Sequence, residues 1–192
     1  MNYLAHAYLS FSDGQLTGNM IADYLKNRDR AALPAEIQKG IRLHREIDTF
    51  TDSHAEIHAA KKLFSPLVRL YSGAFVDVSF DYFLAQKLAE NQKDFKNLTQ
   101  NIYKKLWKNK AFLPADFIFV LEKMEKDDWL FNYQNDWGID YSFRNVLNKA
   151  KYLDAGIPVF DVFLQNKSVL KSHFDVFFPQ LEAHCKNFVN RF

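Results

Sequence analysis

The chain has 192 residues, of which 48% are hydrophobic and 16% aromatic, so it can bury a sizeable core and is not disordered throughout. Its length predicts a single domain. The 25 basic and 23 acidic side chains give a net charge of +2, which argues against a dedicated nucleic-acid binder. Cys185 is the only cysteine, which excludes an internal disulfide and a cysteine-rich zinc site.

The N-terminal residues and the cysteine content predict a cytoplasmic location. Residues 1–10 lack the charged start and the long apolar stretch of a signal peptide. A single cysteine suits a reducing compartment. No uncharged apolar run reaches the roughly 18 residues that indicate a transmembrane helix, so we predict no membrane span.

Helical periodicity dominates the sequence, and we predict an all-α, single-domain helical bundle over residues 1–192. A short apolar segment at residues 3–9 and a turn at residues 12–14 come first. Predicted helices follow at residues 15–27, 35–51, 74–90, 97–109, 115–126, 141–153 and 159–173, with a last helix after Pro179.

Local signals mark some boundaries of these helices. Pro34 suits the first position of the helix at residues 35–51. Ser53 and Glu56 have the spacing of a capping box, which predicts another helix start. Pro66 and Gly73 are predicted to bound a loop.

The predicted helix at residues 35–51 carries polar residues on its apolar face. With His44 at 0° on a helical wheel, Ile37 lies near about 20°, Asp48 near about 40° and Ile41 near about 60°. His44 and Asp48 therefore continue an apolar stripe and point inward. An unpaired buried carboxylate costs several kcal/mol, so a partner is required.

Two more predicted helices show the same pattern. Asp77 and Asp81 share a face with core leucines, and Asp23 shares a face with Leu16 and Met20. The partner can be a metal ion or one of the arginines at positions 42, 45 and 69. Asp23, His44, Asp48, Asp77 and Asp81 together favour a metal site, and such an oxygen-rich set suits Mn²⁺ or Mg²⁺ better than structural zinc.

Four blocks of the chain resemble the signature blocks of the bacterial acyl carrier protein phosphodiesterases, a divergent family of HD-type metal-dependent phosphohydrolases. They lie at residues 2–6, 18–23, 40–52 and 77–85, and the pattern His-Arg-x-Ile-Asp-x-Phe-Thr-Asp at residues 44–52 is the most specific. The resemblance is strong over residues 1–90.

The resemblance implies an all-helical, HD-domain-like core with a divalent metal, typically manganese. The implied ligands are the residues at positions 23, 44, 48, 77 and 81. The adjacent His-Asp pair of usual HD enzymes is absent, so His6 or Asp52 can replace one of them. The implied reaction removes 4′-phosphopantetheine from holo-acyl carrier protein and leaves the apo form.

A mechanism for this reaction can be written with the same residues. A metal held by the acids and His44 would polarise a phosphoryl oxygen and activate a water, which Asp52 or another non-ligating acid would position. Arg45 or Arg42 would neutralise charge on the phosphate, although either arginine can equally be an ordinary carboxylate partner. We take His44, Asp48, Asp52, Arg45 and His6 as candidate catalytic residues.

The basic residues concentrate in the middle of the chain. Residues 93–126 carry eight lysines and four acids, a net charge of +4, whereas the segments on either side are each at −1. A solvated helix face and a docking surface for an acidic partner are equally good interpretations. Acyl carrier proteins are acidic, so Lys104, Lys105 and Lys108 form a candidate docking surface.

Two other functions fit the same sequence. One is an HD-like phosphohydrolase that acts on a nucleotide or another small phosphodiester. The other is a non-catalytic helical module that binds carrier protein or a lipid-like ligand in an aromatic-lined cavity.

Overall fold

The computed structural model describes residues 1–91 and 94–191, and in these ranges it contains helices and no strand. The all-α prediction is therefore confirmed, whereas the likeness to HD domains stays a prediction. The α-helices are α1 (Tyr3–Tyr8), α2 (Asp13–Ile21), α3 (Ala35–Ser53), α4 (Ala55–Val68), α5 (Ser72–Asn91), α6 (Phe95–Lys108), α7 (Ala115–Lys126), α8 (Trp129–Asn132), α9 (Asp136–Lys149), α10 (Val159–Gln165) and α11 (Lys167–Val189).

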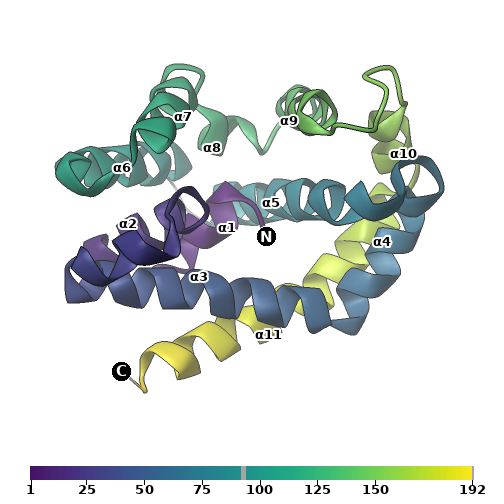
Figure 1. Cartoon of the computed structure of the whole chain (residues 1–192). Coiled ribbons are helices and arrows are strands. Elements are labelled where there is room, and N and C mark those ends of the chain that lie inside the picture. The colour runs from purple at the N-terminus through teal and green to yellow at the C-terminus, as the bar shows by residue number, and fades with distance from the viewer. Residues whose placement is uncertain (92–93, 192) are drawn as a thin grey trace.

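Helix α5 lies across the middle of the molecule and organises the core. Figure 1 shows α6 to α9 above it and α3 and α11 below it. Helices α1, α4, α9 and α11 all pack directly against α5. The core between them is rich in phenylalanine, with fully buried rings such as Phe80 on α5 and Phe174 on α11, whose centroids lie 5.6 Å apart. Across the two described ranges, no helix is long and apolar enough to cross a membrane.

The second helix is displaced from its predicted position. It begins at Asp13, because the Ser12 hydroxyl accepts a hydrogen bond from the Gln15 amide at 3.2 Å and caps the helix. It ends at Ile21 and continues as a 3₁₀ turn, Ala22–Tyr24. The prediction that it continues to residue 27 is wrong, since a separate 3₁₀ segment, Asn27–Ala32, follows.

The predicted capping box at Ser53 is also wrong. His54 caps α4, its Nδ1 accepting a hydrogen bond from the Glu56 amide at 3.2 Å. The Ser53 hydroxyl instead donates to the Phe50 carbonyl within α3. The Glu56 carboxylate reaches His173 on α11, where its Oε2 lies 2.5 Å from Nδ1.

Prolines inside helices account for further differences. Pro66 lies inside α4 and Pro179 inside α11, so neither bounds a helix as predicted. Both are exposed, so water can hydrate the carbonyl group that each leaves unbonded. The chain turns instead at Arg69, whose φ is 47°, and Gly73 lies within α5.

The C-terminal half has more helices than the periodicity indicates. Helix α9 begins at Asp136 rather than at residue 141, and the short α8 lies before it. The predicted helix at residues 159–173 is interrupted at Asn166, which separates α10 from α11. Helix α7 matches its predicted range of residues 115–126.

Two glycines bring α2 and α3 into backbone contact. A Cβ atom on Gly18 would lie 1.9 Å from the Ile37 carbonyl oxygen, and one on Gly40 would lie 2.2 Å from the Gln15 carbonyl oxygen. Only glycine permits such an approach. The contact places Asn19 of α2 against His44 of α3, which positions the candidate site.

Replacing Gly18 with Ala should therefore destabilise the fold. We expect Gly18→Ala to lower the free energy of unfolding by about 2 kcal/mol or more, because two helix backbones must separate. Gly73→Ala is the matched control: its Cβ would meet only the flexible Lys61 side chain at 3.1 Å, so we expect a change within about 1 kcal/mol. Urea denaturation measures both, and equal stabilities of the two variants would contradict the prediction.

Candidate metal centre

Two histidines meet at the centre of the candidate site. His6 on α1 and His44 on α3 are both buried, and their rings are stacked with centroids 4.3 Å apart and planes 19° apart. The Nδ1 atoms of both rings face the same acceptor, the Asn19 Oδ1, at 2.7 Å from His6 and 3.2 Å from His44. One amide oxygen of α2 therefore orients both imidazoles.

The hydrogen bonds of Asn19 determine which nitrogens carry protons. Its Nδ2 donates to the His6 carbonyl oxygen at 2.8 Å and to the Ser10 hydroxyl at 3.1 Å, so Oδ1 is the acceptor. Each histidine Nδ1 must then donate to it. In a neutral imidazole this leaves a lone pair on Nε2, which is the atom that a metal binds.

Acceptor oxygens face both of these Nε2 atoms. Asp48 Oδ1 lies 3.4 Å from His6 Nε2, and its Oδ2 lies 3.1 Å from His44 Nε2. Asp23 Oδ1 lies 3.2 Å from His44 Nε2, and the Met1 carbonyl oxygen lies 3.2 Å from His6 Nε2. His6, His44 and Asp48 each offer one ligand atom, all within 4.8 Å of one another.

The charges of the cluster reflect competition between burial and the carboxylates. Burial lowers the pKa of His6, which keeps its ring neutral near pH 7. Burial also opposes the charge on His44, but Asp23 and Asp48 outweigh it and raise its pKa to about 9. Burial works against the Asp48 carboxylate as well, yet contacts with His44 and His6 hold its pKa well below its usual range. A cation and the His44 proton would compete for the same lone pair.

The donor set fits a divalent cation. In this tautomer the lone pairs of His6 Nε2 and the Met1 carbonyl oxygen face each other at 3.2 Å, a repulsion that a cation bound between them would relieve. His44 Nε2 is buried without a well-aligned hydrogen bond in the described residues, despite its two carboxylate neighbours. Two imidazoles with several carboxylates suit borderline cations such as Mn²⁺.

The two predicted ligands on α5, Asp77 and Asp81, have different surroundings. Asp77 lines the same cleft, with Oδ1 3.3 Å from the Met1 amino nitrogen. Asp81 is fully buried and uses both carboxylate oxygens on the start of α1, accepting from the Leu4 amide at 2.7 Å and the Ala5 amide at 3.1 Å. Burial raises the pKa of Asp81 to about 7.

The predicted catalytic residues Asp52 and Arg45 are exposed on α3. Asp52 lines the cleft, and its Oδ1 lies 3.2 Å from Lys61 Nζ. Arg45 is not among the residues that line the cleft. The cleft has a volume of about 240 Å³ and is lined by Met1, His6, Asp23, His44, Asp48, Thr51, Asp52 and Asp77.

Sequence reasoning missed two residues of this site. Asn19 is completely buried, and it shares the apolar face of α2 with Leu16, the same signal that selected His44. Thr51 is buried in the cleft lining, and its hydroxyl makes no hydrogen bond in the described residues. A short β-branched residue on a helix gives no comparable sequence signal.

The fold and the cluster together define an all-helical protein with a candidate metal-binding cleft. The chain belongs to the acyl carrier protein phosphodiesterase family, whose sequence profile matches residues 1–181. Its relatives include acyl carrier protein phosphodiesterases of Klebsiella pneumoniae (strain 342), 28% identical, and Enterobacter sp. (strain 638), 27% identical. Both alignments cover 97% of this chain and 98% of the relative. No solved structure matches the chain.

Asn19 should control metal affinity without being a ligand. We expect Asn19→Ala to weaken Mn²⁺ binding about 10- to 100-fold, because both imidazoles lose the acceptor that orients them. Asn109→Ala is the matched control, since Asn109 contacts the same helix through the Thr17 hydroxyl at 2.9 Å but neither histidine. Isothermal titration calorimetry with Mn²⁺ measures both, and an unchanged Kd for Asn19→Ala would contradict this role.

Proposed function

We propose that this protein hydrolyses the phosphodiester that joins 4′-phosphopantetheine to holo-acyl carrier protein, and that a divalent cation, Mn²⁺ or Mg²⁺, is bound in the cleft. Family membership supports the substrate. The observation that carries the metal chemistry is the cluster of His6, His44 and Asp48, whose ligand atoms all lie within 4.8 Å of one another. One nitrogen of this cluster, His44 Nε2, is buried without a well-aligned hydrogen bond in the described residues.

His6, His44 and Asp48 would hold the cation, together with Asp23 and Asp77. We assign Asp81 to a different task, because both of its oxygens already bind the backbone of α1 and thereby place His6. When bound, the cation would lower the pKa of a water molecule and stabilise negative charge on the phosphoryl oxygens.

Residues around the cluster would orient the reactants. Asp52, on the same helix as His44 and Asp48, would accept a hydrogen bond from the attacking water. The buried Thr51 hydroxyl would donate to a non-bridging phosphate oxygen. Lys149 lines the adjoining cavity and would supply a positive charge next to the arm. Arg45 is exposed on α3, and its role in neutralising charge on the phosphate stays a prediction from the sequence.

The reaction balances with water as the only co-reactant. The water oxygen forms a bond to phosphorus, and the bond between phosphorus and the serine oxygen of the carrier breaks. The serine oxygen takes up a proton. The products are apo-acyl carrier protein and 4′-phosphopantetheine. The buried, free Cys185 is compatible with our proposal that this happens in the reducing cytoplasm.

Asp48 should be required for this reaction. We expect that the Asp48→Ala variant no longer removes the mass of one phosphopantetheine from holo-carrier protein, because the Asp48 carboxylate faces the Nε2 atoms of both His6 and His44. Asp175→Ala, which removes an exposed acid paired with Lys171 on α11, should leave the rate unchanged. Mass spectrometry of the carrier protein with Mn²⁺ or with chelator measures this.

Two outcomes would contradict the proposal in different ways. If the carrier protein keeps its full mass with wild-type protein and Mn²⁺, the proposed hydrolytic activity is refuted. If the arm is released equally well with chelator, the proposed activity stands and the proposed requirement for a cation is refuted.

We also propose that Lys104, Lys105 and Lys108 on α6 dock the acidic carrier protein. All three are exposed, and Lys105 Nζ lies 3.1 Å from Asp13. Exposed ion pairs of this kind contribute at most about 1 kcal/mol, so an acidic partner can displace Asp13.

Reversing these three charges should slow encounter with the carrier. We expect the triple Lys→Glu variant to lower kcat/KM at low salt by about tenfold or more, with kcat little changed. The matched control reverses three exposed lysines of the C-terminal half, Lys151, Lys171 and Lys186. The same dependence of kcat/KM on salt in the wild-type and triple variant would refute the docking surface.

A further inference from the structure

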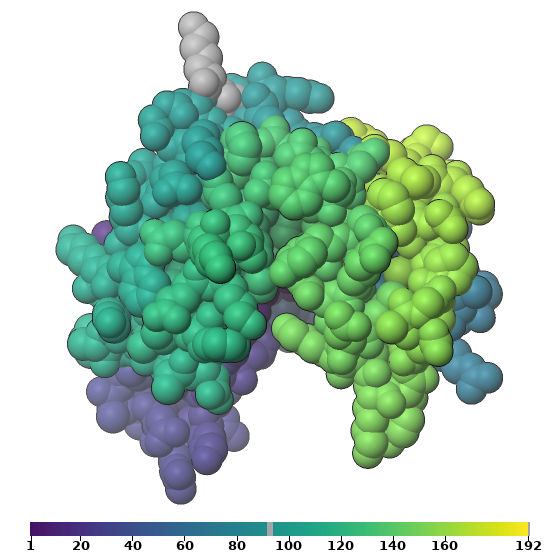
Figure 2. All heavy atoms as spheres, turned by 90° about the horizontal axis from the view of Figure 1, so that it is seen from above, coloured from purple at the N-terminus to yellow at the C-terminus, as the bar shows by residue number. Residues whose placement is uncertain are grey.

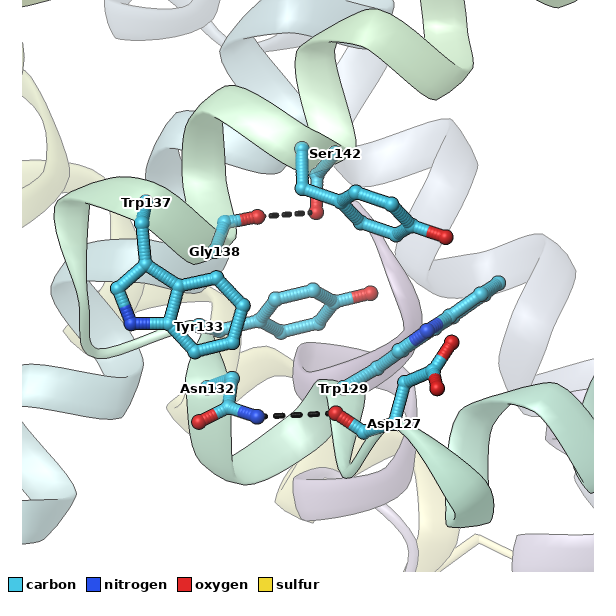
Figure 3. Close-up of a pocket in the computed structure, with 8 residues that line it drawn as sticks. Asp127, Trp129, Asn132, Tyr133, Trp137, Gly138 and Ser142 are labelled. Carbon is cyan, nitrogen blue, oxygen red and sulfur yellow. Dashed lines mark hydrogen bonds between the residues drawn. The ribbon is translucent and has the colours of Figure 1, made fainter.

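An aromatic cavity of about 410 Å³ lies between α8 and α9, outside the candidate metal centre. Figure 3 shows the rings of Trp129, Tyr133 and Trp137 around it. Its shape depends on a close helix contact, because a Cβ on Gly138 would lie 2.2 Å from the Asn132 carbonyl oxygen. Trp137 is 60% exposed, which is unusual for tryptophan and marks the cavity mouth as a candidate binding surface.

This cavity is connected to the metal centre by shared lining residues. A narrow cavity of about 80 Å³ shares Trp129, Tyr133 and Ser142 with it. The narrow cavity in turn shares Asn2, Tyr3 and Lys149 with a third cavity of about 260 Å³.

The third cavity is lined by residues of the metal centre itself, His6, Asp23 and His44. In Figure 2 a hollow opens between two groups of green atoms, with purple atoms of the N-terminal segment at its base. The three cavities therefore form a row, which we call the groove, in which each shares lining residues with the next from the charged cluster to the aromatic cavity.

The chemistry of the lining changes along this groove. At one end are carboxylates and imidazoles. The middle has amide, hydroxyl and ammonium groups, from Asn2, Asn145, Ser142 and Lys149. The far end is aromatic.

One polar atom near the aromatic end is also unsatisfied. The Trp129 Nε1 is buried, and within the described residues it has no hydrogen-bond partner. Trp129 lines both the aromatic and the narrow cavity. A buried N–H without an acceptor is costly, so it favours a ligand that brings a carbonyl oxygen.

We propose, building on the proposed function, that the aromatic cavity binds the far end of the pantetheine arm, with its thiol or an acyl chain attached to it. The order of groups in the arm matches the groove: a phosphodiester, then two amides, then an apolar thioester chain. The amides meet the polar middle and the Trp129 N–H, and the chain packs against the rings.

The test uses S-octanoylpantetheine and pantetheine with the full chain in the presence of chelator, so that binding is measured without hydrolysis. Isothermal titration calorimetry should show saturable binding, about tenfold or more tighter for the octanoyl compound because more apolar surface is buried. Trp137→Ala should weaken octanoyl binding about tenfold or more. Phe119→Ala is the matched control, since Phe119 is 59% exposed on α7 and does not line the cavity.

A kinetic measurement completes the test. With octanoyl-carrier protein and Mn²⁺, Trp137→Ala should raise KM with little change in kcat. No binding of S-octanoylpantetheine to the wild type, or equal Kd values for wild type and Trp137→Ala, overturns the subsite even if the carrier protein is hydrolysed. Binding that Trp137→Ala weakens supports the subsite even if hydrolysis is absent, in which case the proposed function fails alone.

Discussion

The candidate site depends on one amide oxygen that two imidazoles share. Asn19 Oδ1 faces both Nδ1 atoms, and Asn19 Nδ2 binds the His6 carbonyl, so a single buried side chain of α2 ties α1 to α3. Asn19 can reach both rings only because Gly18 and Gly40 let the backbones of α2 and α3 touch. Rearranging this residue would cost several buried hydrogen bonds at once, which keeps the imidazole geometry rigid.

Helix α1 could not hold His6 in place by itself. With six residues, Tyr3–Tyr8, it is far too short to be stable alone. The Asp81 carboxylate on α5 accepts hydrogen bonds from the first free backbone amides of α1. Asn19 accepts a hydrogen bond from the His6 ring and donates one to the His6 carbonyl oxygen. The start of α1 is therefore fixed by a carboxylate from the central helix, so the position of a ligand candidate depends on the packing of α5 in the core.

The sequence predicted α3 and its inward polar face because that helix is regular and its stripe is long. The same reasoning applied to α5 identified Asp81 as buried but not its partner, since an inward acid can bind a metal or cap another helix. Nothing near Asp81 in sequence indicates that the amides of Leu4 and Ala5 are its partners. The sequence signal for His6 is weaker still, because a short apolar segment has no helical periodicity that would show which way the histidine points.

Helix boundaries were the least predictable part of the fold, for physical reasons. In the sequence, Pro66 and Pro179 predict helix breaks. A proline on an exposed helix face leaves only one carbonyl to be hydrated, however, and the packing of α4 and α11 against each other and against α5 outweighs that cost. Whether Ser53 or His54 caps α4 depends on side-chain geometry that the capping pattern does not encode. The narrow and aromatic cavities arise from tertiary packing of α8 and α9, which no local pattern indicates.

The charge of the cleft gives an argument for a cation that is independent of the family. Asp23, Asp48, Asp52 and Asp77 all line it, and the positive groups that line it with them are the Met1 ammonium, 3.3 Å from Asp77, and protonated His44. A phosphodiester is an anion, and two like charges about 4 Å apart repel by about 4 kcal/mol at an effective dielectric constant near 20. Four carboxylates outnumber these two positive groups, so a cation bound between the carboxylates and the phosphodiester would relieve the remaining repulsion. His6, His44 and Asp48, whose ligand atoms all lie within 4.8 Å of one another, are where that cation fits.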